Sequence, residues 1–222
     1  MKPSGRKNVK KRLIGMGRHL VYSEGTKTEI FYANNIKNHI KEDANHINVL
    51  IPVKYSRTKH TCELIDRVEL DVKKRRKNNE FISGIWILFD KDSFEDFKDA
   101  CSIINSKNQK RNDDGEMADD FGTVWHCVPS VQCFEVWYYL HFEDLTVGIE
   151  RKAYIKKINE FIKRKGFAEQ YKKNRENPYD WIKSVGGDVD AAIKRAKKKA
   201  PLTDPSTEVY KFVEFFQAYF EV

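Results

Sequence analysis

Carboxylates at the ends of two predicted strands are the side chains of this sequence best placed for chemistry. Glu24 follows the apolar run 19–23, and Asp90 and Asp92 close the run that begins at residue 85. Strand ends of an open parallel sheet lie along one edge, so we expect the three carboxylates to meet there. Converging carboxylates repel one another unless protons or a cation offset their charge, and hard oxygen ligands suit Mg²⁺ or Mn²⁺. The sequence therefore predicts a divalent metal site with Asp90 and Asp92 as ligands.

Glu24 either completes that ligand shell or serves as a general acid or base. A glutamate beside Mg²⁺ stays ionised, so the role of base is the easier one at neutral pH. Gly25 permits a tight turn, and the amides of residues 26–28 at a helix start can face a phosphate. Hydrolysis of a phosphodiester is the chemistry that such a site suits, because Mg²⁺ offsets the charge of the phosphate oxygens. The spacing of a Walker loop is missing, so ATP hydrolysis by this chain alone is not expected.

Three sequence blocks, taken in order, resemble the RloB family, whose domain is similar to the Toprim domains of topoisomerases, bacterial primases and OLD-type nucleases. The blocks are Glu-Gly-Thr-Lys-Thr-Glu-Ile-Phe-Tyr at 24–32, Phe-Asp-Lys-Asp-Ser-Phe at 89–94, and a longer block at 129–142. The third block reads Ser-Val-Gln-Cys where the family pattern has Ser-Asn-Pro-Cys, so we expect a loop of different shape. The resemblance covers roughly residues 18–145. It implies a nuclease of prokaryotic defence against phage, often beside an ATPase that senses infection.

The resemblance also implies roles for single residues. Glu24 corresponds to the general acid/base glutamate of Toprim enzymes. Glu29 and Glu135 correspond to acids that hold a second metal in OLD-type nucleases, although acids in a first helical turn are also favoured by the helix dipole alone. Lys183 and Lys194 are both candidates for the lysine that stabilises transition-state charge in those nucleases, and the sequence does not choose between them.

Alternating patterns predict an α/β fold. We expect strands at residues 18–23, 46–53, 82–89 and 122–128. We expect helices at residues 27–40, 62–77, 94–104, 133–142 and 150–165, and from 205 onward. Repeated β-then-α units imply right-handed crossovers and hence a Toprim-like, mostly parallel four-stranded sheet flanked by helices. The second strand is continuously apolar, as is typical of a buried parallel strand.

The remaining segments divide the chain into three parts. We expect a basic flexible tail at 1–17, a Toprim-like catalytic domain at 18–145, and a helical extension packed on it at 146–222. Residues 106–120 are polar and aperiodic and predict a mobile loop. Ser130 is a candidate helix cap.

Two features of the extension give specific expectations. Gly166 should end a helix in a left-handed cap. Asp204 and Pro205 predict a helix start, as cap and first-turn residue. The apolar face that follows, through Phe212 and Phe216, either packs on the domain or seats a partner, so a homodimer stays open.

Net charge favours nucleic acid, either RNA or DNA, as the partner. The chain carries 41 basic and 33 acidic side chains, and its formal charge is +8. Basic clusters lie within residues 1–12, 73–77 and 194–199. Such clusters attract phosphate regardless of base sequence, although each one alone also suits a solvated helix face.

Composition also excludes several classes of protein. No run of 18 apolar residues exists and residues 1–12 lack an apolar signal core, so we expect a cytoplasmic protein without membrane association. Four scattered cysteines fit a reducing compartment, and their spacing disfavours zinc. His141 is expected to be a core histidine. Two alternatives to the nuclease stay open, which are a catalytically silent subunit that binds nucleic acid or the ATPase, and a nucleotidyl transferase like the primases.

Overall fold

The computed structural model describes residues 17–42, 44, 47–56, 58, 60–91 and 95–220 of the chain. Asp92 and the basic tail up to residue 16 lie outside the described residues. The metal-ligand role expected of Asp92 and the flexibility expected of the tail therefore stay predictions.

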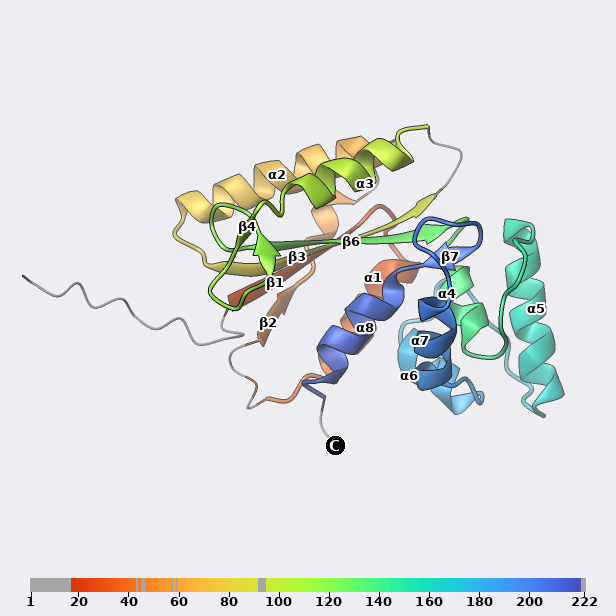
Figure 1. Ribbon diagram of the computed structural model, residues 1–222. Coiled ribbons are helices and arrows are strands. Elements are labelled where there is room, and N and C mark those ends of the chain that lie inside the picture. The colour runs from red at the N-terminus through yellow and green to blue at the C-terminus, as the bar shows by residue number, and fades with distance from the viewer. Residues whose placement is uncertain are drawn as a thin grey trace, which may run out of the picture.

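A five-stranded sheet in the order β2-β1-β3-β6-β7 forms the centre of the molecule (Figure 1). Its strands are β1 (Gly17–Ser23), β2 (Ile47–Leu50), β3 (Ile82–Lys91), β6 (Val124–Val131) and β7 (Ser206–Thr207). The first four pair in parallel, and the two-residue β7 joins β6 antiparallel. The predicted α/β fold with a mostly parallel sheet is confirmed, and it is consistent with a Toprim-like fold. The C-terminal extension adds the fifth strand.

Helices cover both faces of this sheet. They are α1 (Thr28–Asn38), α2 (Thr61–Lys77), α3 (Phe97–Ser106), α4 (Glu135–Leu140), α5 (Arg151–Arg164), α6 (Pro178–Ser184), α7 (Val189–Lys197) and α8 (Val209–Gln217). Figure 1 shows α2 and α3 together on one face, with α1 and α8 on the other. A single 3₁₀ turn, η1 (Val53–Tyr55), precedes α2. Each of these described helices is too short or too polar to span a bilayer.

Alternate residues of β3 supply two separate cores, because successive side chains of a strand point to opposite faces. Ile85 and Ile87 pack with α2 and α3, whereas Trp86 and Leu88 pack with α1, α4 and α8. The second core continues through α5, α6 and α7. Residues of the predicted extension therefore share one hydrophobic core with the sheet.

Trp86 anchors α8 on the sheet. Its indole stacks on His126 with ring centroids 3.6 Å apart, and it meets the rings of Phe212 and Phe216 at 5.5 Å. The apolar face of α8 thus packs on the domain, which is one of the two outcomes that the sequence left open.

The predicted helix start at Asp204 and Pro205 is wrong. The backbone of residues 206–207 instead pairs with β6 as β7, and α8 begins only at Val209. Ser130 is not a helix cap either, because it lies within β6, where its hydroxyl lies 3.0 Å from the hydroxyl of Thr207. Strand pairing between distant segments outweighed the local capping signals.

Two further expectations need correction, and one is confirmed. Residues 106–120 contain a small hairpin, β4 (Lys110–Arg111) with β5 (Met117–Ala118), in which the Asn112 side chain accepts from two backbone amides of the turn. Strand β2 is an edge strand with Asn48 exposed, and is not buried on both faces. Gly166 follows α5 with φ of +87°, as predicted for a left-handed cap.

The histidines beneath α8 make folding stability depend on pH. Burial lowers the pKa of His19 to about 4 and that of His126 to about 3. Below pH 6.5 the unfolded chain takes up protons that these buried rings do not, so their stabilising contribution is full above pH 6.5 and is lost as the pH falls toward 4. We expect the free energy of unfolding to drop by up to about 1.4 kcal/mol per pH unit and per histidine in this window.

Urea denaturation at pH 7.0, 5.5 and 4.5 measures this effect. His126→Phe keeps the ring stacked on Trp86 and removes one titrating group, so its stability should fall less steeply with acidity. Val147→Ala, a change at an exposed residue without a titrating group, is the control and should keep the wild-type slope. Equal slopes for all three proteins would contradict the assignment.

Candidate active site

The carboxyl ends of three parallel strands meet along one edge of the sheet. Ser23 of β1 is in register with Leu88 of β3, and Asp90 of β3 is in register with Ser130 of β6. Glu24 comes directly after β1, and its backbone N–H donates to the carbonyl of Leu88 at 3.2 Å. The structure therefore brings the ends of the first and second sequence blocks to the same edge.

Asp90 lies buried beside the first residue of α5. It stands two positions after Leu88, so it shares the sheet face that α1 and α4 cover. Only 7% of the residue is exposed, and its Oδ2 lies 3.2 Å from Nη2 of Arg151. The Asp90 carboxylate thus faces the core layer that also holds the first turns of α1 and α4.

Glu29 and Glu135 complete an acidic cluster with Asp90. Glu29 lies in the first turn of α1 and is 8% exposed, and Glu135 begins α4 and is 2% exposed. Nζ of Lys173 lies 3.1 Å from Glu135 Oε1, and the hydroxyl of Tyr171 donates to the same oxygen at 3.3 Å. The two glutamates predicted from the resemblance are therefore buried near the sheet edge, and their role in binding a metal stays a prediction.

Electrostatic effects show that these groups lie within reach of one another. Burial raises the pKa of Glu29, the charge of Glu135 raises it further, and the cations Lys173 and Arg151 oppose that rise. Burial likewise raises the pKa of the Cys133 thiol, and both Glu135 and Asp90 add to that effect. Glu29, Asp90 and Glu135 thus form one like-charged cluster offset by two basic side chains.

The donor set fits Mg²⁺ or Mn²⁺ in its chemistry, because buried carboxylates that repel one another gain most from a hard cation. In the part of the chain that the structure describes, no three His, Cys, Asp or Glu side chains are close enough to enclose an ion. Arg151 and Lys173 supply the positive charge in this arrangement. Asp92, the second ligand expected from the sequence, lies outside the described residues.

Gly25 sets the position of Glu29. A Cβ atom at this position would lie too close to Oε2 of Glu29, so any larger residue would displace that carboxylate from the turn between β1 and α1. The glycine of the first sequence block therefore leaves room for the Glu29 carboxylate in its observed position.

The loop after β6 departs from the family pattern, as the sequence suggested. Gln132 has φ of +85°, in the left-handed region, and the hydroxyl of Tyr154 donates to its side chain. Proline fixes φ near −65°, so the Pro-containing pattern could not adopt this loop. The buried side chains of Cys133 and Glu135 follow this turn.

Sequence reasoning missed three residues of the site: Arg151, Tyr171 and Lys173. The cations that contact the acidic cluster are Arg151 and Lys173, and the candidates Lys183 and Lys194 lie on α6 and α7. Arg151 is 61 positions from Asp90, and Tyr171 is 36 positions from Glu135. No local pattern links residues so far apart, and the density of basic residues between 150 and 175 was the one available signal.

A model of the RloB-like protein family matches residues 19–216. The chain belongs to the RloB-like family. The match extends beyond residue 145, so in this RloB-like protein the family relation includes α5, which supplies Arg151, and the segment between α5 and α6, which supplies Lys173. Searches among curated proteins and among solved structures found no match.

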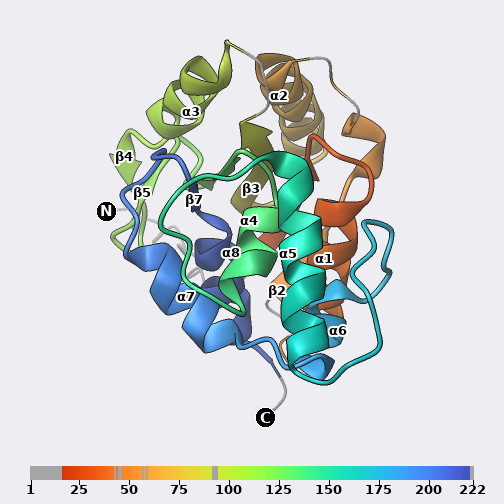
Figure 2. The same cartoon turned by 90° about the vertical axis from the view of Figure 1, so that its right-hand side faces the viewer.

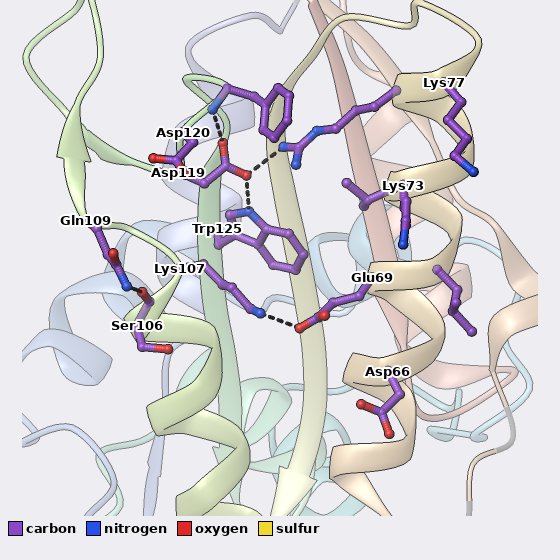
Figure 3. A pocket seen from close by; sticks show the side chains of 14 residues that line it. Asp66, Glu69, Lys73, Lys77, Ser106, Lys107, Gln109, Asp119, Asp120 and Trp125 are labelled. Atoms are coloured by element: carbon purple, nitrogen blue, oxygen red, sulfur yellow. Dashed lines mark hydrogen bonds and ion pairs between the residues drawn. The ribbon is translucent and has the colours of Figure 1, made fainter.

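A separate hollow of about 1020 Å³ lies between α2 and α3, on the opposite face of the sheet from α1 and α8 (Figure 3). Several of its charged side chains pair with one another. Asp119 accepts from Arg76 at 2.5 Å and from the indole N–H of Trp125 at 2.8 Å, and Lys107 pairs with Glu69. None of the predicted site residues lines this hollow.

Lys173 should stabilise the RloB-like protein most when metal is absent. Lys173→Ala leaves the Glu135 carboxylate buried without its cation, and because Lys173 is 45% exposed we expect a loss of about 1 to 2 kcal/mol in EDTA. Mg²⁺ or Mn²⁺ should restore more of the melting temperature to this variant than to the wild type. Differential scanning fluorimetry with each ion and with EDTA measures both effects. Lys172→Ala, at an exposed neighbouring lysine, should change neither value.

Proposed function

We propose that this RloB-like protein is a Mg²⁺- or Mn²⁺-dependent nuclease that hydrolyses phosphodiester bonds of RNA or DNA. The observation that carries the proposal is the burial of Asp90, Glu29 and Glu135 together at the carboxyl edge of a parallel sheet. In open α/β sheets this edge is where ligands bind. Burial of three like charges is unfavourable for folding. Clusters of this kind are typical of functional sites, where the reaction requires them.

Asp90, Glu29 and Glu135 are the residues that would hold the metal, together with Asp92 on the grounds of sequence. A bound ion would offset phosphate charge and lower the pKa of a water molecule. Glu24 is proposed as the general base, because it stands at the same edge and is expected to be ionised beside a cation.

Arg151 and Lys173 are proposed to bind the phosphate group of the substrate. Each contacts a buried acid at one end and is about half exposed, at 44% and 45%. If a metal ion bound the carboxylates of Asp90 and Glu135, both cations would be available to bind a phosphate group of the substrate. Arginine suits this task because its planar fork matches phosphate oxygens.

The family relation supports a cytoplasmic role in prokaryotic defence against phage beside an ATPase partner. That part of the proposal rests on the resemblance of the three sequence blocks, and the lack of a Walker loop fits a division of labour in which a second protein hydrolyses ATP. A homodimer is compatible with it.

Asp90→Ala and Glu135→Gln test the proposed site. Purified proteins are incubated with RNA and DNA in Mg²⁺, Mn²⁺ or EDTA, and intact substrate is measured with time. Each variant should lose cleavage by at least about a hundredfold, as expected when a group that stabilises developing charge is removed. Glu135→Gln keeps an oxygen that can accept from Tyr171, so its stability should change by less than about 1 kcal/mol.

Glu116→Gln, at an exposed residue of the hairpin between β4 and β5, is the matched control and should cleave like the wild type. Full activity in both site variants would overturn the assignment. Incorporation of labelled nucleotides without strand loss would favour nucleotidyl transfer. Binding of nucleic acid without either reaction would favour the catalytically silent subunit.

A further inference from the structure

The segment between α5 and α6, residues 165–177, forms a strap over the acidic cluster. Tyr171 and Lys173 contact Glu135 from this strap, and the hydroxyl of Thr28 at the start of α1 donates to the carbonyl of Lys173 at 3.4 Å. The backbone N–H of Tyr171 also donates to Asn159 of α5 at 2.6 Å. Figure 2 shows the strap as the loop that leaves the end of α5 and returns to α6. Helix α5 and the strap therefore border the entrance to the site.

This border carries most of the excess positive charge of the protein. Residues 151–177 hold ten Lys and Arg against three Asp and Glu, an excess of seven beside the +8 of the whole chain. On α5 and the strap the exposed cations are Arg151, Lys152, Lys156, Lys163, Arg164, Lys165, Lys172 and Lys173. A row of cations that leads to a candidate phosphodiester site favours a polyanion as the partner.

A hollow of about 510 Å³ lies in the groove between α5 and the strap. Lys156, Asn159 and Lys163 line it from one face of the helix, and Phe167 and Gln170 line it from the strap. Its volume lies in the range of small-molecule sites, and the ring of Phe167 is 38% exposed. An exposed aromatic ring between two lysines and two amides is a suitable seat for a nucleobase flanked by phosphates.

Two acids in the same hollow are already paired. Glu169 accepts from the indole N–H of Trp181 at 2.7 Å and lies 3.3 Å from Arg175, and Glu160 lies 4.0 Å from Lys156. Their charges therefore oppose a polyanion less than unpaired carboxylates would. A second hollow of about 420 Å³ adjoins α5 and shares Lys163 with the first.

The depth of the acidic cluster selects the form of the nucleic acid. Asp90, Glu29 and Glu135 are at most 8% exposed, so a phosphate must enter a recess to approach them. In a duplex, each phosphate backbone lies on the outside of a wide and rigid helix. If one strand approached the recess, the other would collide with α5 and the strap. A single strand bends freely and exposes its bases for stacking, so it can follow the groove.

We propose that α5 and the strap bind single-stranded nucleic acid, with a base in the hollow against Phe167 and the adjoining phosphates on Lys156 and Lys163. From there the strand passes Arg151 and Lys173 to the acidic cluster. The inference deepens the proposed nuclease function by naming the form of its substrate, and it rests on that function for what happens at the cluster. Binding itself requires no cleavage.

Fluorescence anisotropy in EDTA tests this binding surface without catalysis. The probes are a fluorescein-labelled 20-nucleotide RNA, the DNA of the same sequence, and the duplex of that DNA. The wild type should bind the single strands at least about tenfold more tightly than the duplex. Comparison of the affinities for the RNA and the DNA strand shows whether the surface prefers one of the two nucleic acids.

A pair of charge reversals locates the surface. Lys156→Glu with Lys163→Glu should weaken single-strand binding by at least about tenfold and flatten its salt dependence, since each lost phosphate contact lowers the slope by about 0.7. Lys73→Glu with Lys77→Glu makes the same change of charge at the hollow between α2 and α3, and should alter affinity by no more than about threefold. Equal losses in the two double variants would mean that only net charge matters and would overturn the proposal.

Removal of one aromatic ring tests the base seat. Phe167→Ala should weaken single-strand binding about tenfold, the order expected for one stacked base, whereas Phe121→Ala at the other hollow should not. Thermal melts of all variants confirm that they fold. Tight binding of the duplex, or no effect of Phe167→Ala, would sink the inference. If single strands bind as expected but are not cleaved in Mg²⁺ or Mn²⁺, the binding surface is supported and only the proposed nuclease function is rejected.

Discussion

Repulsion between buried carboxylates is the constraint around which the rest of this structure is arranged. Glu29, Asp90 and Glu135 come from three separate segments and meet where water is largely excluded. Burial and the charge of Glu135 both raise the pKa of Glu29 and so favour its protonated form. Arg151 and Lys173 approach from outside the sheet and offset part of this charge.

That requirement explains why the helices after residue 145 are integral to the protein. Helix α5 supplies Arg151, and the segment between α5 and α6 supplies Lys173. The helices extend the hydrophobic core that begins on β1 and β3, and the chain then returns to the sheet as β7. The family match over residues 19–216 covers the same elements. A buried acidic cluster and its counter-charges thus belong to one folding unit, since neither is favourable without the other.

Local patterns were sufficient for most of the fold. The alternation of apolar strands and amphipathic helices predicted the four parallel strands to within a few residues, because each strand is a short apolar run bounded by polar turns. It also placed Glu24 and Asp90 at one sheet edge. Failures occurred where distant residues decide the outcome. Residues 206–207 pair with β6 although the local sequence predicts the start of a helix there. The side chain of Asn112 stabilises a hairpin turn in a segment whose composition predicted only a loop.

The site was predictable on its acidic side and not on its basic side. Carboxylates follow from strand ends and helix starts, which are local features, whereas Arg151 and Lys173 are two of the ten cations within residues 151–177. Only the path of the chain after α5 distinguishes them from their neighbours. Gly25 is an intermediate case, because a turn glycine was expected there while its contact with Glu29 was not.

The place of β7 near the end of the chain has a consequence for synthesis. A polypeptide is synthesised from its N-terminus. Residues 24, 29, 90 and 135 therefore leave the ribosome well before residues 206–207, which pair with the edge of β6. Until then the growing polypeptide lacks a fixed position for α8 on Trp86 and exposes an unpaired strand. The acids of the cluster are thus synthesised well before the segment that covers this edge of the sheet and positions α8 on Trp86.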